Sequence, residues 1–225
     1  ALLRAARDSG WHEYGEAAIA IAHDFVNLCL APDPRAPDEL LLIPGAEARR
    51  DDDRVLINPS YFMSRALREL GVAADEPRLI RAADHSETVL AELAATGFLP
   101  NWVDVTRTGF AEPREHDALW GYDALRIPLY LVWSGQKNHP AVALARTLLG
   151  GSDIPGHLVV EATSEGEPRA QSNHPGYRAI RDFAACPSPH ELSSGDLQSV
   201  YYPDTLLLLV EVAMRETDCS RQDWP

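Results

Sequence analysis

A succession of helix-forming segments is the feature that most limits the fold of this chain. Apolar residues recur at three- and four-residue spacing in one segment after another, and Gly or Pro residues punctuate the segment ends. No strand alternates with helix as in a βαβ unit, and no internal repeat is evident. Helices are expected over residues 1–7, 11–30, 58–70, 77–96, 120–133, 140–149, 176–185 and 196–215.

Start and stop signals support several of these helices. Asn58 precedes Pro59, so we expect Asn58 as the N-cap and Pro59 as the first helical residue. The helix over 77–96 should stop at Gly97. Pro128 should interrupt the helix over 120–133.

The connections between the helices contain short extended segments. Residues 40–43 and 55–57 are apolar and flank an Arg/Asp-rich turn, so they are expected to pair as a hairpin. Residues 31–37 contain three prolines and are expected as a loop. Residues 98–110 are expected to be irregular or extended, and residues 158–168 predict a second small hairpin. Antiparallel helix pairs joined by loops of alternating length build a solenoid or a closed α/α toroid, and we favour an all-α toroid.

Composition excludes several classes of function. The chain has 34 acidic and 20 basic residues, a net charge of −14, and no basic stripe, so no nucleic-acid partner is expected. Its apolar runs are far shorter than the roughly 20 residues that cross a bilayer. The histidines and cysteines lack metal-ligand spacing, and no nucleotide-binding motif occurs, so no metal or other cofactor is expected. Cys29, Cys186 and Cys219 fit either one disulfide or three free thiols.

The first seven residues are helical sequence from the first position, with no Met or capping residue before them. We therefore expect the sequence to begin inside a helix and to be truncated at its N-terminus. Such a truncation should leave an apolar face exposed along the helices over 1–7 and 11–30.

Two polar segments at helix starts are candidates for chemistry: residues 58–62 and 121–129. At i and i+3 on a helix, Asp123 and Arg126 are neighbours, so the guanidinium can hold the carboxylate ionised and in one orientation. An oriented carboxylate beside a tyrosine can act as a general base for water. The same spacing also fits a solvated ion pair at a helix N-terminus, so spacing alone does not decide.

Three segments together resemble glycoside hydrolase family 8. They are Asn-Pro-Ser-Tyr-Phe at 58–62, Gly-Phe-Leu-Pro-Asn-Trp-Val at 97–103 and Tyr-Asp-Ala-Leu-Arg at 122–126, in the family's order and with similar spacing. The resemblance covers nearly the whole chain. It implies an incomplete (α/α)6 toroid whose first helices are missing, with β-hairpin excursions in its loops. Residues 1–225 would be the C-terminal two-thirds of the family's catalytic domain.

The resemblance also implies endo-acting hydrolysis of a β-1,4-glucan with inversion. Inversion uses an acid and a base whose carboxyl groups stand about 6.5–9.5 Å apart. By the matching motifs, Asp123 takes the place of the general base, Tyr61 helps to hold the attacking water, and Arg126 braces the base. Tyr122 would line the same subsite.

Aromatic side chains in an open cleft can stack on sugar rings, and Trp102, Tyr201 and Tyr202 are candidates. Aromatic residues at helical spacing are more often part of a core. We assign Trp133, which lies within an apolar helix, to packing.

One part of the family's pattern does not occur in this sequence. The general acid of family 8 is a glutamate in a Ser-Glu-Gly-x-x-Tyr-Gly segment, and the 225 residues contain no such segment. One carboxylate cannot both protonate the leaving oxygen and activate water on the opposite face of the sugar, so we expect this polypeptide alone to be inactive.

Two other functions remain open: a non-catalytic relative that binds glucan or a protein partner, and a toroid hydrolase that acts on xylan or chitosan. The resemblance implies a periplasmic or secreted location, and makes the cellulose-synthesis or secretion machinery a candidate partner.

Overall fold

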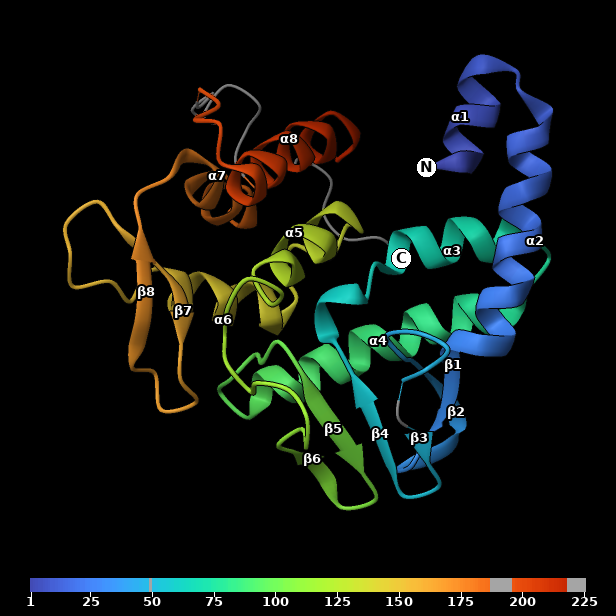
Figure 1. The fold of residues 1–225 in the computed structure, drawn as a ribbon, viewed down its shortest axis with the longest axis horizontal. Coiled ribbons are helices and arrows are strands. Elements are labelled where there is room, and N and C mark those ends of the chain that lie inside the picture. Colours follow the sequence, from blue (N-terminus) through green and yellow to red (C-terminus); the bar gives the residue numbers. More distant parts are fainter. Residues whose placement is uncertain (49, 187–195, 218–225) are drawn as a thin grey trace.

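Helices form the frame of the molecule, and the strands lie in excursions from it (Figure 1). The computed structural model describes residues 1–48, 50–186 and 196–217. Within these residues the helices are α1 (Leu2–Ser9), α2 (His12–Cys29), α3 (Ser64–Ala73), α4 (Pro77–Ala95), α5 (Arg126–Trp133), α6 (Pro140–Leu149), α7 (Pro175–Ala184) and α8 (Tyr201–Glu216), with a 3-10 turn η1 (Pro59–Tyr61).

Consecutive helices pack in pairs: α1 with α2, α3 with α4, α5 with α6 and α7 with α8. In Figure 1 the pairs follow one another along an arc from α1 and α2 to α7 and α8. The described helices do not close this arc into a barrel, in agreement with the expected incomplete toroid.

Side chains link the two ends of the arc. Arg4 of α1 binds Glu216 of α8 at 2.5 Å and Glu69 of α3 at 3.2 Å. Arg65 of α3 binds the same two glutamates, and the Trp133 indole of α5 donates to Glu216 at 2.9 Å. Four helices that are far apart in the sequence therefore share one cluster of charges.

Three antiparallel sheets account for the strands. β1 (Leu30–Asp33) pairs with β2 (Ala36–Leu42), and β7 (Leu158–Ala162) pairs with β8 (Pro168–Ser172). The third sheet has the order β3 (Arg50–Asp51), β4 (Arg54–Ile57), β5 (Val103–Thr106), β6 (Gly109–Ala111). The predicted hairpin over 158–168 is confirmed, and the expected irregular or extended segment over 98–110 contains β5 and the start of β6.

The predicted pairing of residues 40–43 with 55–57 is wrong. Residues 40–42 belong to β2, which pairs with β1, whereas residues 55–57 belong to β4, which pairs with β3 and β5. The proline-rich segment expected as a loop is extended because its turn is held by the buried Asp33. That carboxylate accepts hydrogen bonds from the backbone and guanidinium of Arg35 and also contacts His85 of α4 at 2.8 Å.

Three helices begin later than the sequence predicts. Asn58 is the expected cap and accepts from the Ser60 amide, but it opens the turn η1, and α3 starts only at Ser64. The helix expected from residue 120 starts at Arg126, because Trp120 pairs with Ala162 of β7 through two backbone hydrogen bonds of 3.1 and 2.9 Å. The helix expected from residue 196 starts at Tyr201.

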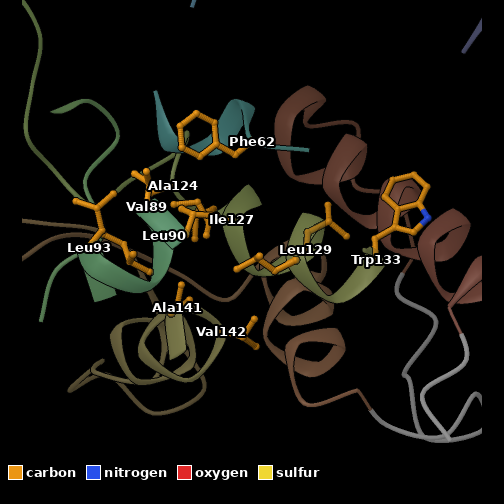
Figure 2. Close-up of a cluster of buried hydrophobic side chains, with 14 of the residues drawn as sticks. Phe62, Val89, Leu90, Leu93, Ala124, Ile127, Leu129, Trp133, Ala141 and Val142 are labelled. Carbon is orange, nitrogen blue, oxygen red and sulfur yellow. The ribbon is translucent and has the colours of Figure 1, made fainter. Parts of the chain in front are cut away.

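The hydrophobic core is centred on α4, α5 and α6. Figure 2 shows side chains from these three helices in one cluster, with Phe62 at its edge. Phe62 follows Tyr61 in sequence, and the buried Ala124 follows Asp123. The core therefore anchors both segments that were predicted to carry chemistry.

The outer side of α2 is apolar and exposed. Its buried face consists of Ala18, Ala22 and Val26, whereas Ile21 is 54% and Leu28 is 47% exposed. The helix α1 buries no residue. The expected exposed apolar face is therefore present on α2, whereas the leucines of α1 are only partly exposed.

Of the three cysteines, Cys29 has a free thiol and Cys186 is disulfide-bonded. Cys219 lies outside the described residues. No helix in the described part of the chain is long and apolar enough to cross a membrane.

Candidate active site

Sheet pairing brings two of the predicted segments together. Ile57 at the end of β4 is paired with Val103 at the start of β5. Asn58 follows the first of these residues and Trp102 precedes the second, so both segments leave the sheet at the same edge. The third segment is attached by Asn101, whose Oδ1 accepts from the Ala124 amide at 3.0 Å.

Four side chains form a closed ring of hydrogen bonds around Asp123. Arg126 Nη2 donates to Asp123 Oδ1 at 2.5 Å, and Asn58 Nδ2 donates to Asp123 Oδ2 at 3.1 Å. The same Arg126 nitrogen donates to Ser60 Oγ at 2.8 Å, and Ser60 Oγ donates to Asn58 Oδ1 at 2.6 Å. Each carboxylate oxygen therefore has its own donor, which fixes the rotamer of Asp123.

The capping geometry orients the Asn58 amide. Its Oδ1 accepts from both the amide and the hydroxyl of Ser60. An amide side chain has one acceptor oxygen and one donor nitrogen, so Nδ2 is left to face Asp123. The residue thus serves as both helix cap and carboxylate ligand.

Burial differs sharply around the ring. Asn58 and Ser60 are buried, while the Asp123 side chain is 30% exposed. The supporting side of the ring is therefore dry, and the carboxylate itself reaches solvent. A fixed carboxylate that water can approach is suited to take a proton from that water.

A row of aromatic side chains extends from Arg126. Its guanidinium lies 5.7 Å from the centre of the exposed Tyr61 ring. The Trp102 ring follows at 6.1 Å and 73° to Tyr61, and the His116 imidazole lies parallel to Trp102 at 4.1 Å. The row provides an aromatic surface beside the carboxylate.

A second aromatic group lies on the α8 side of Asp123. The Tyr202 hydroxyl donates to the backbone carbonyl of Tyr122, and the two rings meet edge to face at 5.6 Å. Burial raises the pKa of Tyr202 far above its usual value, against the opposing effect of Arg126, and burial raises the pKa of Tyr177 to about 12. Both hydroxyls stay protonated at neutral pH, so Tyr202 remains a donor.

The structure brings together most of the residues predicted for the site: Asp123, Arg126, Tyr61, Trp102, Tyr122 and Tyr202. Tyr201 is not among them, because its side chain is 86% exposed while its neighbour Tyr202 packs against Tyr122. Successive helical residues point about 100° apart, so the two tyrosines cannot share one direction. Trp133 packs in the core, as expected.

Sequence reasoning did not identify Asn58, Ser60, Asn101 or His116 as part of this group. Asn58 was recognised only as a cap, and a cap uses its oxygen alone. The side-chain nitrogen Nδ2 of a capping asparagine was the available signal, since this donor requires an acceptor when it is buried.

A separate cavity of about 660 Å³ lies between the β1–β2 hairpin and the turn end of the β3–β6 sheet. It is lined by Leu30, Ala31, Pro32, Asp33, Pro34, Pro37, Arg50, Asp51, Asp52, Val55 and Arg107, and none of the residues around Asp123 contributes to it. The described residues contain no cluster of His, Cys, Asp and Glu that would hold a metal ion.

Residues 1–152 match the family model for Glycosyl hydrolases family 8. This chain belongs to glycosyl hydrolase family 8. The matched range contains all three segments that converge on Asp123. Membership confirms the resemblance seen in the sequence.

This family 8 chain is similar to a probable endoglucanase of Novacetimonas hansenii, with 27% identity over 96% of the chain. It spans 64% of the length of that relative. An endoglucanase of Xanthomonas axonopodis pv. citri is 32% identical over 48% of the chain and 27% of its own length.

Solved structures have the same fold. The endo-β-1,4-glucanase CMCax from Acetobacter xylinum superposes with a TM-score of 0.77 at 26% identity, over 96% of this chain and 68% of that one. The endoglucanase Cel10 from Klebsiella pneumoniae, a family 8 glycosyl hydrolase, superposes with a TM-score of 0.82 at 22% identity, over 96% of this chain and 69% of that one. These similarities and the arc of helix pairs confirm the predicted fold class, an incomplete (α/α)6 toroid with strands in its loops.

Proposed function

We propose that this chain supplies the base side of an endo-acting, inverting hydrolysis of β-1,4-glucan. The observation that carries the proposal is the hydrogen-bonded ring, which presents one oriented, water-accessible carboxylate beside aromatic side chains. Family membership supports hydrolysis of a glycosidic bond. The substrate class follows from relatives that are named endoglucanase and endo-β-1,4-glucanase.

Each residue of the group has a role in this proposal. Asp123 accepts the proton of a water as that water attacks the anomeric carbon, and Arg126 and Asn58 keep the carboxylate aimed at it. Tyr61 helps to hold the water in line. The fixed position makes Asp123 a more effective general base, because a carboxylate already held in place lowers the entropic cost of reaching the transition state.

Aromatic residues contact the sugar rings in this proposal. Tyr122 precedes Asp123 in the chain and packs against Tyr202, and Trp102 is linked to Arg126 through the Tyr61 ring. Tyr201, exposed at the start of α8, is proposed to contact more distant units of a long glucan.

The reaction also needs an acid to protonate the leaving oxygen. The family's Ser-Glu-Gly-x-x-Tyr-Gly segment is not found in the 225 residues, and the ring described above consists of Asp123, Arg126, Asn58 and Ser60. We therefore propose that residues 1–225 form part of a catalytic domain and do not hydrolyse cellulose by themselves.

The proposal extends to location and partners. A periplasmic or secreted site of action fits the disulfide at Cys186, because disulfides persist in oxidising compartments. The cellulose-synthesis or secretion machinery is the proposed partner, since β-1,4-glucan is its product.

The test compares the 225-residue polypeptide with a fusion in which a family 8 segment containing Ser-Glu-Gly-x-x-Tyr-Gly precedes it. On carboxymethyl cellulose, we expect no reducing sugar from the polypeptide and steady release from the fusion. Asp123→Asn in the fusion should lower the rate at least about 100-fold, since a positioned base contributes about 10²–10⁴. Asp38→Asn, at an exposed position on β2, is the matched control and should leave the rate unchanged.

Each contrary outcome has its own meaning. Turnover by the polypeptide alone that disappears in Asp123→Asn would show that an acid is already present. Turnover by the fusion that survives Asp123→Asn would remove Asp123 as the base. Binding of cellohexaose without turnover by a folded fusion would favour a non-catalytic relative, and cleavage of xylan or chitosan in place of cellulose would change the substrate class.

A further inference from the structure

His116 covers one face of Trp102. The imidazole and indole planes are 12° from parallel and their centres are 4.1 Å apart, which is direct stacking contact. The Tyr61 ring meets the indole at 73°, an edge-to-face contact, so it does not stack on Trp102. The stacked face is therefore already filled by a side chain of the same molecule.

The segment that carries His116 is fixed at both ends and exposed between them. At its start, the Glu112 carbonyl accepts from Arg54 at 2.8 Å and Pro113 is buried. At its end, the Leu119 carbonyl accepts from the Asn101 amide at 2.6 Å. Residues 114–117 are all exposed, so solvent reaches the span between the two anchors.

A sugar ring and an imidazole cannot share one face of an indole. A pyranose that stacks on an aromatic ring lies parallel to it at van der Waals distance, which is the position of His116. Trp102 is linked through Tyr61 to Arg126 and so belongs to the surface beside Asp123. A side chain that covers this face of Trp102 therefore competes with a sugar ring for it.

We propose that His116 is a self-bound cap on the Trp102 subsite, which a glucan must displace in order to bind there. This inference rests on the proposed function, because it takes a β-linked oligosaccharide as the ligand. The cap lowers the affinity of the subsite by the strength of the stack that must be broken. It also shields the indole when no glucan is present.

Calorimetric titration of cellohexaose into the 225-residue polypeptide tests the cap. An aromatic pair is strong enough that His116→Ala should tighten binding about two- to tenfold. His12→Ala, an exposed histidine at the start of α2, is the matched control and should leave the affinity unchanged. In a Trp102→Ala background the gain from His116→Ala should vanish, since the cap acts only through the indole.

A spectroscopic readout reports the displacement itself. In the free protein the His116 ring protons lie over the indole, so their NMR signals should be shifted by its ring current. Saturation with cellohexaose should move these signals to the positions they have in Trp102→Ala. Signals that keep their shift in the saturated protein would overturn the cap.

The remaining outcomes separate the cap from the proposed function. Weaker binding by His116→Ala would show that the imidazole contacts the sugar, and unchanged binding would show that it does not compete; either result overturns the cap and leaves the glucan function standing. If neither the wild type nor His116→Ala binds cellohexaose, the glucan assignment fails for this chain and the cap fails with it. Xylohexaose and chitosan hexamer, titrated in parallel, identify the ligand class in that case.

Discussion

Two helices of similar length, α4 and α2, have very different surroundings. Eight of the 19 residues of α4 are buried, against three of the 18 residues of α2. The helix α4 is packed by α3, α6 and β2, whereas α2 contacts mainly α1 and α3. The interior around α4 supports Phe62 and Ala124, which flank the candidate site, so packing quality and site geometry are concentrated in the same part of the molecule.

The contrast teaches that a long apolar helix does not by itself define the core. Ile21 and Leu28 of α2 are as apolar as the buried leucines of α4, yet they face solvent. What differs is the presence of neighbouring helices on each side. Matched substitutions should therefore lower the free energy of unfolding by different amounts in the core around α4 and on α2.

The largest difference is expected from removing one buried and one exposed aliphatic side chain. Leu90→Ala should lower the free energy of unfolding by about 2–5 kcal/mol, because it leaves a cavity among α4, α5 and α6. Ile21→Ala on α2 should change it by less than about 0.5 kcal/mol. Urea denaturation followed by circular dichroism measures both. Equal losses would show that α2 is packed as tightly as α4.

Two glycines provide the next comparison. A Cβ at Gly176 of α7 would lie 1.8 Å from the Pro203 carbonyl oxygen of α8, whereas a Cβ at Gly15 of α2 would lie 3.7 Å from Ala6. Gly176→Ala should destabilise by about 3 kcal/mol or more, since backbone must move to relieve the overlap. Gly15→Ala should stabilise by about 0.5–1 kcal/mol through helix propensity. Thermal unfolding gives the sign, and a harmless Gly176→Ala would mean that α7 and α8 are farther apart.

The smallest effect concerns the charges that join the ends of the arc. Burial opposes ionisation of Glu216, but hydrogen bonds from Arg4 and Trp133 outweigh it and lower the pKa of this carboxyl. A lowered pKa contributes stability that is complete above the unfolded value of about 4.3 and is lost as the pH falls through the folded value. Glu216→Gln should cost about 0.5–1 kcal/mol at pH 6.

The pH dependence provides the control for this last prediction. Between pH 6 and pH 3, Glu216→Gln should lose less free energy of unfolding than the wild type, because it has no carboxylate to protonate there. Glu39→Gln, at an exposed position on β2 away from any helix terminus, is the matched control for the loss of one carboxylate. Parallel curves for wild type and Glu216→Gln would mean that the cluster does not contribute to stability.

The helices with local signals were predictable from sequence. Residues 77–96 and 140–149 have Pro at the first turn and a regular apolar stripe, and the observed helices end within one residue of the prediction. The β1–β2 hairpin was missed because its turn depends on Asp33, which is stabilised by His85 more than 50 residues away. No local pattern records such a partner.

The candidate site likewise contains one contact that the local sequence predicts and others that depend on distant residues. The pairing of Asp123 with Arg126 was predictable, since they stand at i and i+3, although Asp123 lies in the turn before α5 and Arg126 is the first residue of that helix. The contact between Asn58 and Asp123 joins positions 65 residues apart and depends on three-dimensional packing. The stack of His116 on Trp102 was missed for a different reason: the charged sequence around His116 is indistinguishable from an ordinary solvated loop.

The pairing of Ile57 with Val103 has a consequence for how this fold tolerates change in length. Asn58 and Trp102 leave the sheet directly after this pair, whereas the turns at residues 52–53 and 107–108 lie at its other end. Residues inserted in those turns add to the surface and leave the pair in place. A single residue inserted between Ile57 and Asn58 leaves β4 paired but displaces Asn58 from its position beside Asp123. Natural and engineered insertions should therefore accumulate at the far turns and be absent from the two junctions beside the carboxylate.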